Sequence, residues 1–417
     1  MSIAKKIKPD PAKAKSAPED ALHAEARDSK ADAPGRLTSV ELFSGCGGLA
    51  LGTARAGFHH EKMVEWNKEA CVTLGHNKTR GVEHVAGWDF VNGDVRQIDW
   101  SGIKAAVDLV AGGPPCQPFS VGGLAKGYDD ARDMWPETIR AVRELAPRAF
   151  MFENVKGLSR PAFEPYLKWI MAHLAQPGSP RGAKEAHAAH WARLKKKPHL
   201  DQYDVLFIKV NAADYGAPQK RHRVIIAGAR KDLGLALSAP GATHSRERLA
   251  WDKWVSGDYW RRHGMARPAE AQMDEADKAL AQRLSKGMAA PCTLPWVTVR
   301  DALAGLGEPD GKNNHALQKG AKAYPGHTGC PLDEPAKALK AGAHGVPGGE
   351  NMMVKDDGTV RYFSVREAAR LQGMPDDWVF VSAWGECMRQ LGNAVPTQLA
   401  QALGGWMAST LRSAPKA

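Results

Sequence analysis

An α/β fold is the prediction that three features of this sequence support. Residues 37–43 form an apolar strand, residues 44–48 a glycine-rich turn, and residues 49–56 a helix. A strand, a glycine turn and a helix in this order hold nucleotide-like ligands, because glycines let a ligand approach the backbone and the helix start offers free N–H groups. Apolar runs at 107–111 and 149–155 supply further buried strands.

Composition narrows the class of protein. At 417 residues the chain can bury a large core in two domains, and its net charge of +11 suits a polyanionic partner. It contains neither an apolar run of about 18 residues nor a secretory signal, so we expect no membrane span. Six scattered cysteines without a Cys-x-x-Cys pair fit a reducing, cytoplasmic compartment. His327, Cys330 and His344 could bind a metal, but we prefer a loop without metal because no second ligand pair is in view.

Acidic side chains end the strands that follow the glycine turn. Residues 63–65 form a short strand ending in Glu65, at about the spacing at which an acid meets ribose hydroxyls in nucleotide-binding folds. Trp66 could cover an adenine face, and Asp94 could accept a hydrogen bond from an adenine amino group. Each acid alone would more often be a solvated loop residue, whereas the ordered series favours a cofactor site.

The stretch Gly-Gly-Pro-Pro-Cys-Gln-Pro-Phe-Ser at 112–120 presents one thiol, Cys116, after the strand at 107–111. The two prolines fix the backbone immediately before it. A free thiol with a pKa of about 8.5 is partly thiolate near neutral pH, and a thiolate is a strong nucleophile. The alternative is a cysteine that only packs in a proline-rich loop.

Charged residues in two further segments could complete a reaction centre. Glu153 follows four apolar residues, where a carboxylate is costly unless it is paired or functional. Partial burial would favour its protonated form and make it a proton donor, whereas a strand-terminal glutamate facing water is the alternative. Arg221 and Arg223 alternate at a strand start, so both project from one side. Their planar donor groups could stabilise developing negative charge, although each alone could be surface charge.

The stretch at 112–120 strongly resembles the nucleophile loop of the cytosine-C5 DNA methyltransferases. Glu153-Asn154-Val155, Gln219-x-Arg221-x-Arg223 and Gln-Leu-Gly-Asn-Ala-Val-Pro at 390–396 are similar to later motifs of that family, in the same order. The resemblance covers roughly residues 38–411. It implies a Rossmann-like S-adenosylmethionine-dependent methyltransferase domain with a smaller, irregular target-recognition domain. The implied reaction is methylation of C5 of a flipped cytosine in a specific duplex DNA sequence, through a covalent Cys116–C6 adduct.

The resemblance also implies roles for single residues. Cys116 would attack C6, Glu153 would contact N3, Arg223 would read the base edge with Glu153, and Arg221 would support a phosphate or the nucleophile loop. Contacts to S-adenosylmethionine are expected from Phe43, Ser44, Gly45, Gly47, Gly48, Glu65, Trp66, Asp94, Val95, Asn393 and Val395. Contacts to DNA are expected from Gln117, Ser120, Arg132 and Gln219.

The predicted organisation is a disordered tail, a catalytic domain and a recognition domain. Their bounds are 1–36, then 37–242 with 384–417, and 243–383. Residues 243–295 are a basic and aromatic insertion that suits either a nucleic-acid surface or tryptophans packed on a helix. We expect a solvated loop at 176–202, a mobile active-site loop at 126–135, and Ala338 where the family often has threonine.

Duplex DNA is the expected partner of a monomer, with a separately encoded restriction endonuclease as a further partner. Two alternatives stay open. An RNA cytosine-C5 methyltransferase would use the same chemistry, but the long recognition segment at 243–362 argues against it. A non-catalytic DNA-binding module would keep the fold, but the intact Cys116, Glu153, Arg221 and Arg223 argue against that.

Overall fold

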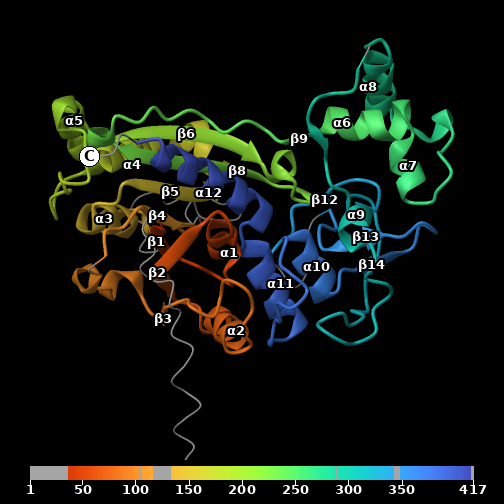
Figure 1. The fold of residues 1–417 in the computed structure, drawn as a ribbon, viewed down its shortest axis with the longest axis horizontal. Coiled ribbons are helices and arrows are strands. Elements are labelled where there is room, and N and C mark those ends of the chain that lie inside the picture. Colours follow the sequence, from red (N-terminus) through yellow and green to blue (C-terminus); the bar gives the residue numbers. More distant parts are fainter. Residues whose placement is uncertain (1–35, 104, 116–132, 288, 342–347, 415–417) are drawn as a thin grey trace, which may run out of the picture. The chain divides into compact units, whose positions relative to one another are not determined.

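A seven-stranded sheet is the centre of the fold (Figure 1). Its order in space is β3-β2-β1-β4-β5-β8-β6, with the first five strands parallel and β8 antiparallel to both β5 and β6. The strands are β1 (Leu37–Leu42), β2 (Phe58–Glu65), β3 (Phe90–Asn92), β4 (Leu109–Gly112), β5 (Ala149–Val155), β6 (Tyr203–Asn211) and β8 (His222–Arg230). The predicted α/β class is confirmed.

This computed structural model describes residues 36–103, 105–115, 133–287, 289–341 and 348–414. Leu37–Ala417 form one compact unit. Several predictions lie outside the described residues, namely those on the tail up to residue 35, on residues 126–132 of the expected active-site loop, and on Cys116, Gln117, Ser120, Arg132 and His344. The boundary between the catalytic and recognition domains stays a prediction. In the part of the chain described here, no helix has both the length and the apolar character needed to cross a membrane.

Alternation along the central strands places apolar side chains on both faces of the sheet. Leu109 and Ala111 of β4 pack on one face, in a core shared with α1 (Gly48–Arg55) and α12 (Thr397–Arg412). Val110 packs on the opposite face, in a core shared with α3 (Trp135–Leu145) and α4 (Glu164–Ala175). The helices therefore cover both faces, which buries the central strand β4 completely and explains the continuous apolar runs at the centre of the sheet.

The C-terminal half adds short elements that pack beside the seven-stranded sheet. β7 (Gln219–Lys220), immediately before β8, pairs with β12 (Ala336–Lys337). Leu74 of α2 (Lys68–Thr79) shares a third core with residues of α10 (Val365–Leu371) and α11 (Trp384–Asn393). The other elements of this half are β9 (His244–Ser245), α6 (Arg246–Ala250), α7 (Asp258–Arg262), α8 (Glu275–Ser285), β10 (Leu294–Pro295), α9 (Val299–Leu303), β11 (Cys330–Pro331), β13 (Met352–Val354) and β14 (Val360–Tyr362).

Two expectations about the insertions can be compared with this fold. The expectation of a solvated loop at 176–202 is wrong in part, because the segment contains the helix α5 (His187–Lys195), which packs on α4. Buried His190 fixes this contact, since its Nδ1 accepts a hydrogen bond from Trp169 Nε1 at 3.1 Å. In the insertion at 243–295 the structure favours packing over an aromatic nucleic-acid surface, because Trp254, Tyr259 and Trp260 are buried in a core of their own.

Close contact between α1 and α12 depends on Gly52. A Cβ atom built at Gly52 would lie 2.3 Å from Ala400 Cβ and 2.6 Å from the carbonyl oxygen of Thr397, so no larger residue fits. We expect Gly52→Ala to lower the free energy of unfolding by about 1–3 kcal/mol, the usual cost of overpacking. Gly405, on the same helix α12, has open space at its Cβ position. Gly405→Ala should therefore stabilise the protein by up to about 1 kcal/mol through helix propensity. Urea unfolding of both variants tests this contrast, and equal effects would contradict it.

Candidate active site

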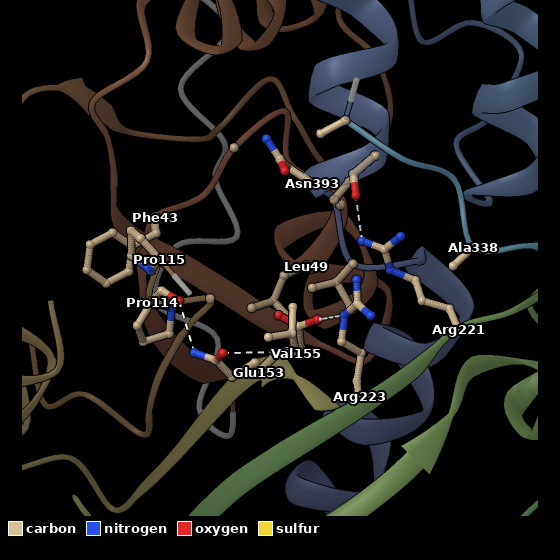
Figure 2. A pocket seen from close by; sticks show the side chains of 18 of the residues that line it. Phe43, Leu49, Pro114, Pro115, Glu153, Val155, Arg221, Arg223, Ala338 and Asn393 are labelled. Atoms are coloured by element: carbon tan, nitrogen blue, oxygen red, sulfur yellow. Dashed lines mark hydrogen bonds and ion pairs between the residues drawn. The ribbon is translucent and has the colours of Figure 1, made fainter. Parts of the chain in front are cut away.

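A pocket of about 1180 Å³ lies at the carboxyl ends of the strands. The strand order reverses between β1 and β4, and ligands of open α/β sheets bind outside the carboxyl ends at such a point. Figure 2 shows side chains from several parts of the chain around it, including Phe43 after β1, Pro114 and Pro115 after β4, and Glu153 on β5. The volume exceeds that of most single-ligand sites, which is about 300–1,000 Å³, so two ligand groups fit.

The glycine turn after β1 forms one wall of the pocket. Phe43 has a φ of 58°, a left-handed conformation that costs a non-glycine residue of the order of 1–3 kcal/mol and is concentrated at functional sites. Gly48 begins α1 directly against the last motif, because a Cβ there would lie 2.4 Å from the carbonyl oxygen of Val395. The close approach brings Ser44, Gly45 and Gly48 together with Asn393 and Val395, and all five line the pocket.

Glu65 connects the glycine turn to the end of β2. Its Oε2 accepts a hydrogen bond from the Gly45 N–H at 2.7 Å, and its Oε1 accepts one from the Asn67 N–H at 2.6 Å. Burial raises the pKa of Glu65 above its ordinary value, and these N–H donors partly oppose the rise. Each carboxylate oxygen keeps a second lone pair, so Glu65 can still accept hydrogen bonds from a ligand.

The adjacent Trp66 is open to solvent. Its side chain is 66% exposed, and the Arg96 guanidinium lies 5.7 Å from its ring centroid. The exposed indole lies beside Glu65 and the glycine turn, where no atom lies within 4 Å of the Gly45 Cβ position. This open space fits a nucleoside-like group. Asp94 instead pairs with Arg96 at 2.6 Å. Among the cofactor residues predicted, Gly47, Asp94 and Val95 do not line the pocket.

A second group of residues gathers on β5 and β8. Glu153 forms an ion pair with Arg223, 2.5 Å between Oε1 and Nε, because β5 and β8 are neighbours in the sheet (Figure 2). Both side chains are 13% exposed. The Nε–H does not point at the carboxylate, so it is a buried donor without a hydrogen bond although the charges touch.

The same strand holds the start of the predicted nucleophile loop. Asn154 Nδ2 donates a hydrogen bond to the carbonyl oxygen of Pro114 at 3.1 Å. Glu153 Oε2 lies 3.5 Å from the position that a Cβ would take at Gly113. The carboxyl group of Glu153 is thus next to the Gly113–Pro115 turn that leads into the predicted nucleophile loop. Asn154 belongs to the Glu153-Asn154-Val155 motif, and the sequence alone indicated no separate role for it.

Arg221 links two segments that line the pocket, one at Leu339 and the other at Gly392. It is buried, and it donates hydrogen bonds to the carbonyl oxygens of Leu339 at 3.1 Å and Gly392 at 2.7 Å. Ala338, where the family often has threonine, lines the pocket beside this contact (Figure 2). Gln219 was expected to contact DNA, but it is fully buried and its Nε2 donates to the Leu371 carbonyl oxygen at 2.8 Å. That placement gives the Gln219 side chain a packing contact instead of access to DNA.

His60 connects β1 and α1, the two elements on either side of the glycine turn. It gives a prediction about how stability depends on pH. Its ring is buried, Nε2 donates to the Ala50 carbonyl oxygen of α1 at 2.9 Å, and Nδ1 accepts from the Ser39 hydroxyl at 2.9 Å. Burial lowers the pKa of His60 to about 4. The folded value is below the unfolded value of about 6.5, so its contribution to stability is present above pH 6.5 and is lost as the pH falls toward 4.

When the pH falls from 7 to 5, the His60 imidazole alone should lower the free energy of unfolding by about 2 kcal/mol. Denaturant unfolding at both pH values measures this decrease in the free energy of unfolding. The native protein should show the decrease of about 2 kcal/mol, and His60→Gln should lack it. The exposed His199 provides the matched variant, since His199→Gln should keep the full pH dependence. A His60→Gln variant with an unchanged pH dependence would contradict the prediction.

Comparisons with known proteins agree with this geometry. A family model described as C-5 cytosine-specific DNA methylase matches residues 37–178 and 184–408. The chain is 30% identical over 387 residues to the type II methyltransferase M.NgoMIV of Neisseria gonorrhoeae, covering 90% of this chain and 99% of the relative. It is 31% identical over 386 residues to M.PspPI of Psychrobacter sp. (strain TA137), covering 90% and 80%. A prophage-encoded E. coli protein assigned as a DNA modification methyltransferase has a similar fold, with a TM-score of 0.55, 23% identity, and coverage of 90% and 100%.

Proposed function

From the premise that this chain belongs to the C-5 cytosine-specific DNA methylase family, and is therefore a DNA (cytosine-5-)-methyltransferase, we propose how its pocket performs the reaction. The methyl donor is S-adenosylmethionine, and the acceptor is C5 of a cytosine in a specific duplex sequence. Because C5 is inaccessible inside a duplex, the cytosine must flip out into the pocket. The observation that carries this proposal is the Glu153–Arg223 pair beside the Gly113–Pro115 turn.

The β1–β2 side of the pocket suits the methyl donor. When bound, S-adenosylmethionine supplies a methyl group on a positively charged sulfur, which makes the methyl group transferable. Glu65 would accept hydrogen bonds from the ribose hydroxyls with its remaining lone pairs, and Trp66 would cover the adenine. Asn393 and Val395 would line the methionine end, where they meet the glycine turn. Asp94 would need to leave Arg96 to contact an adenine amino group.

The β5–β8 side of the pocket suits the base. Cytosine C5 is a poor nucleophile, so the Cys116 thiolate would first add to C6 while Glu153 gives a proton to N3. That addition makes C5 enamine-like, and C5 then takes the methyl group by in-line displacement. Loss of the C5 proton to a water and return of the N3 proton would expel Cys116. Arg223 would hold the polar edge of the base with Glu153, and Arg221 would keep the Leu339 and Gly392 walls in place.

Sequence readout is assigned to residues 307–362, whose loops would enter the major groove, where each base pair presents a distinct pattern. The relatives M.NgoMIV and M.PspPI are named type II methyltransferases, and these names indicate restriction–modification. We therefore extend the proposal to a monomer that protects its recognition sequence from a separately encoded endonuclease.

The experiment that tests this function is the mapping of methylated cytosines in DNA from cells that express the chain. We expect 5-methylcytosine at one short sequence, and none in cells that carry the empty vector. RNA from the same cells should remain unchanged. Methylation confined to RNA would favour the RNA enzyme, and its absence from both nucleic acids would favour a non-catalytic binding module.

A further inference from the structure

Basic side chains outnumber acidic ones around the pocket. Among the described residues that line it are seven lysines and arginines but only two acids, Glu65 and Glu153. Three of the seven are engaged: Arg223 with Glu153, Arg389 with Glu386 at 2.6 Å, and Arg221 with two carbonyl oxygens. The other four are Lys156, Arg160, Lys209 and Lys340, here called the rim cations.

The rim cations are exposed, and within the described ranges none of them has a carboxylate within 4.0 Å. Other cations close to the sheet are paired, as Arg140 is with Glu137 at 2.7 Å. Four uncompensated positive charges at one pocket therefore create a local positive potential that attracts an anion.

The position of the rim cations separates them from the cofactor side. Lys156 directly follows β5, and Lys209 lies near the end of β6, paired in register with Val224 of β8. Arg160 directly follows the short helical turn Lys156–Ser159. Lys340 follows Leu339, whose carbonyl oxygen accepts a hydrogen bond from Arg221. β5, β8 and β6 are consecutive in the sheet, whereas Glu65 and Trp66 follow β2, on the opposite side of β1 and β4. Lys156, Arg160 and Lys209 thus belong to the half of the pocket that contains Glu153 and Arg223, and Lys340 lies against Gly392, which Arg221 also contacts.

We infer that Lys156, Arg160, Lys209 and Lys340 bind the DNA phosphates on either side of the flipped cytosine. The inference rests on the proposed function and names the contacts that its substrate makes at the pocket entrance. Lysine is a compact charge on a flexible stem, which suits phosphate oxygens and carries no base information. A flipped nucleotide loses stacking and pairing, so phosphate contacts formed only when its backbone reaches the pocket would offset part of that cost.

The experiment measures duplex DNA binding against salt concentration, for a duplex that contains the recognition site. Each phosphate contact contributes about −0.9 to the slope of log K against log salt. Replacing all four rim cations by glutamine should make this slope less negative by about 3.6 and should weaken binding at low salt. S-adenosylmethionine affinity, measured by calorimetry without DNA, should stay unchanged because the β1–β2 side keeps its residues.

A second variant controls for net charge. Lys184, Lys196, Lys197 and Lys286 are exposed, do not line the pocket, and have no ion pair among the described residues. Their fourfold glutamine variant loses the same charge and should keep most of the native slope. A native slope in the rim variant, or an equal loss in the control variant, would overturn the inference. Because binding needs no turnover, a native protein that binds DNA through the rim cations but methylates nothing would support the inference and contradict the proposed function.

Discussion

Glu153→Gln is expected to slow methyl transfer by about 100-fold or more, the usual scale for loss of general acid catalysis. Glutamine keeps the shape of the side chain but has no proton to give to N3, so addition of the thiolate to C6 would leave negative charge on the ring. The change also removes the charge partner of Arg223, which lies 2.5 Å away. Single-turnover rates at saturating DNA and S-adenosylmethionine measure the chemical step apart from binding.

The fold should tolerate this change, which makes the prediction specific. Glu153 accepts no hydrogen bond from a core residue in the described structure, and the strand around it is fixed by Asn154 and by the β5–β8 register. S-adenosylmethionine affinity should therefore remain near that of the native protein. Glu164→Gln serves as a control, because Glu164 is an exposed acid paired only with Lys168. An unchanged single-turnover rate in Glu153→Gln would remove this residue from the mechanism.

The sheet and the glycine turn could be predicted from the sequence because local patterns determine them. The continuous apolar runs of β4 and β5, which pack on both faces of the sheet, and the glycines at positive φ after β1 leave a direct signal in residue types. The contact between Glu153 and Arg223 is different in kind. It joins residues that are far apart in the chain, and it exists only because β8 inserts antiparallel beside β5. The resemblance suggested both residues for the site, while their spacing in the sequence could not show that they touch.

Other features could not be predicted because burial depends on partners elsewhere in the chain. Gln219 has an ordinary polar side chain, yet it is fully buried and donates a hydrogen bond to the Leu371 carbonyl oxygen of α10. Trp254 and Trp260 are interleaved with arginines as on a nucleic-acid surface, and a local core buries them. No sequence pattern identifies the rim cations either. An exposed lysine or arginine beside a pocket has the same sequence neighbours as one on any solvated loop.

Cys116→Ser is expected to abolish methyl transfer, because a serine hydroxyl stays protonated near neutral pH and cannot add to C6 as a thiolate does. S-adenosylmethionine binding should persist, since Glu65, Trp66 and the glycine turn, which we propose to hold it, are unchanged. Substantial residual turnover would remove Cys116 from the mechanism.

Duplex DNA with 5-fluorocytosine at the target tests the same step directly. Thiolate addition to C6 and methyl transfer to C5 can both proceed, but fluorine cannot leave C5 as a proton does. Elimination is then blocked, so the native enzyme should remain attached through Cys116 in an adduct that survives denaturation and is visible as a shifted gel band. The adduct should require S-adenosylmethionine and should be missing in Cys116→Ser. Glu153→Gln should form it slowly, because the proton at N3 assists the addition that precedes trapping. A cofactor-dependent adduct on fluorinated RNA but never on duplex DNA would overturn the assignment of DNA as the substrate.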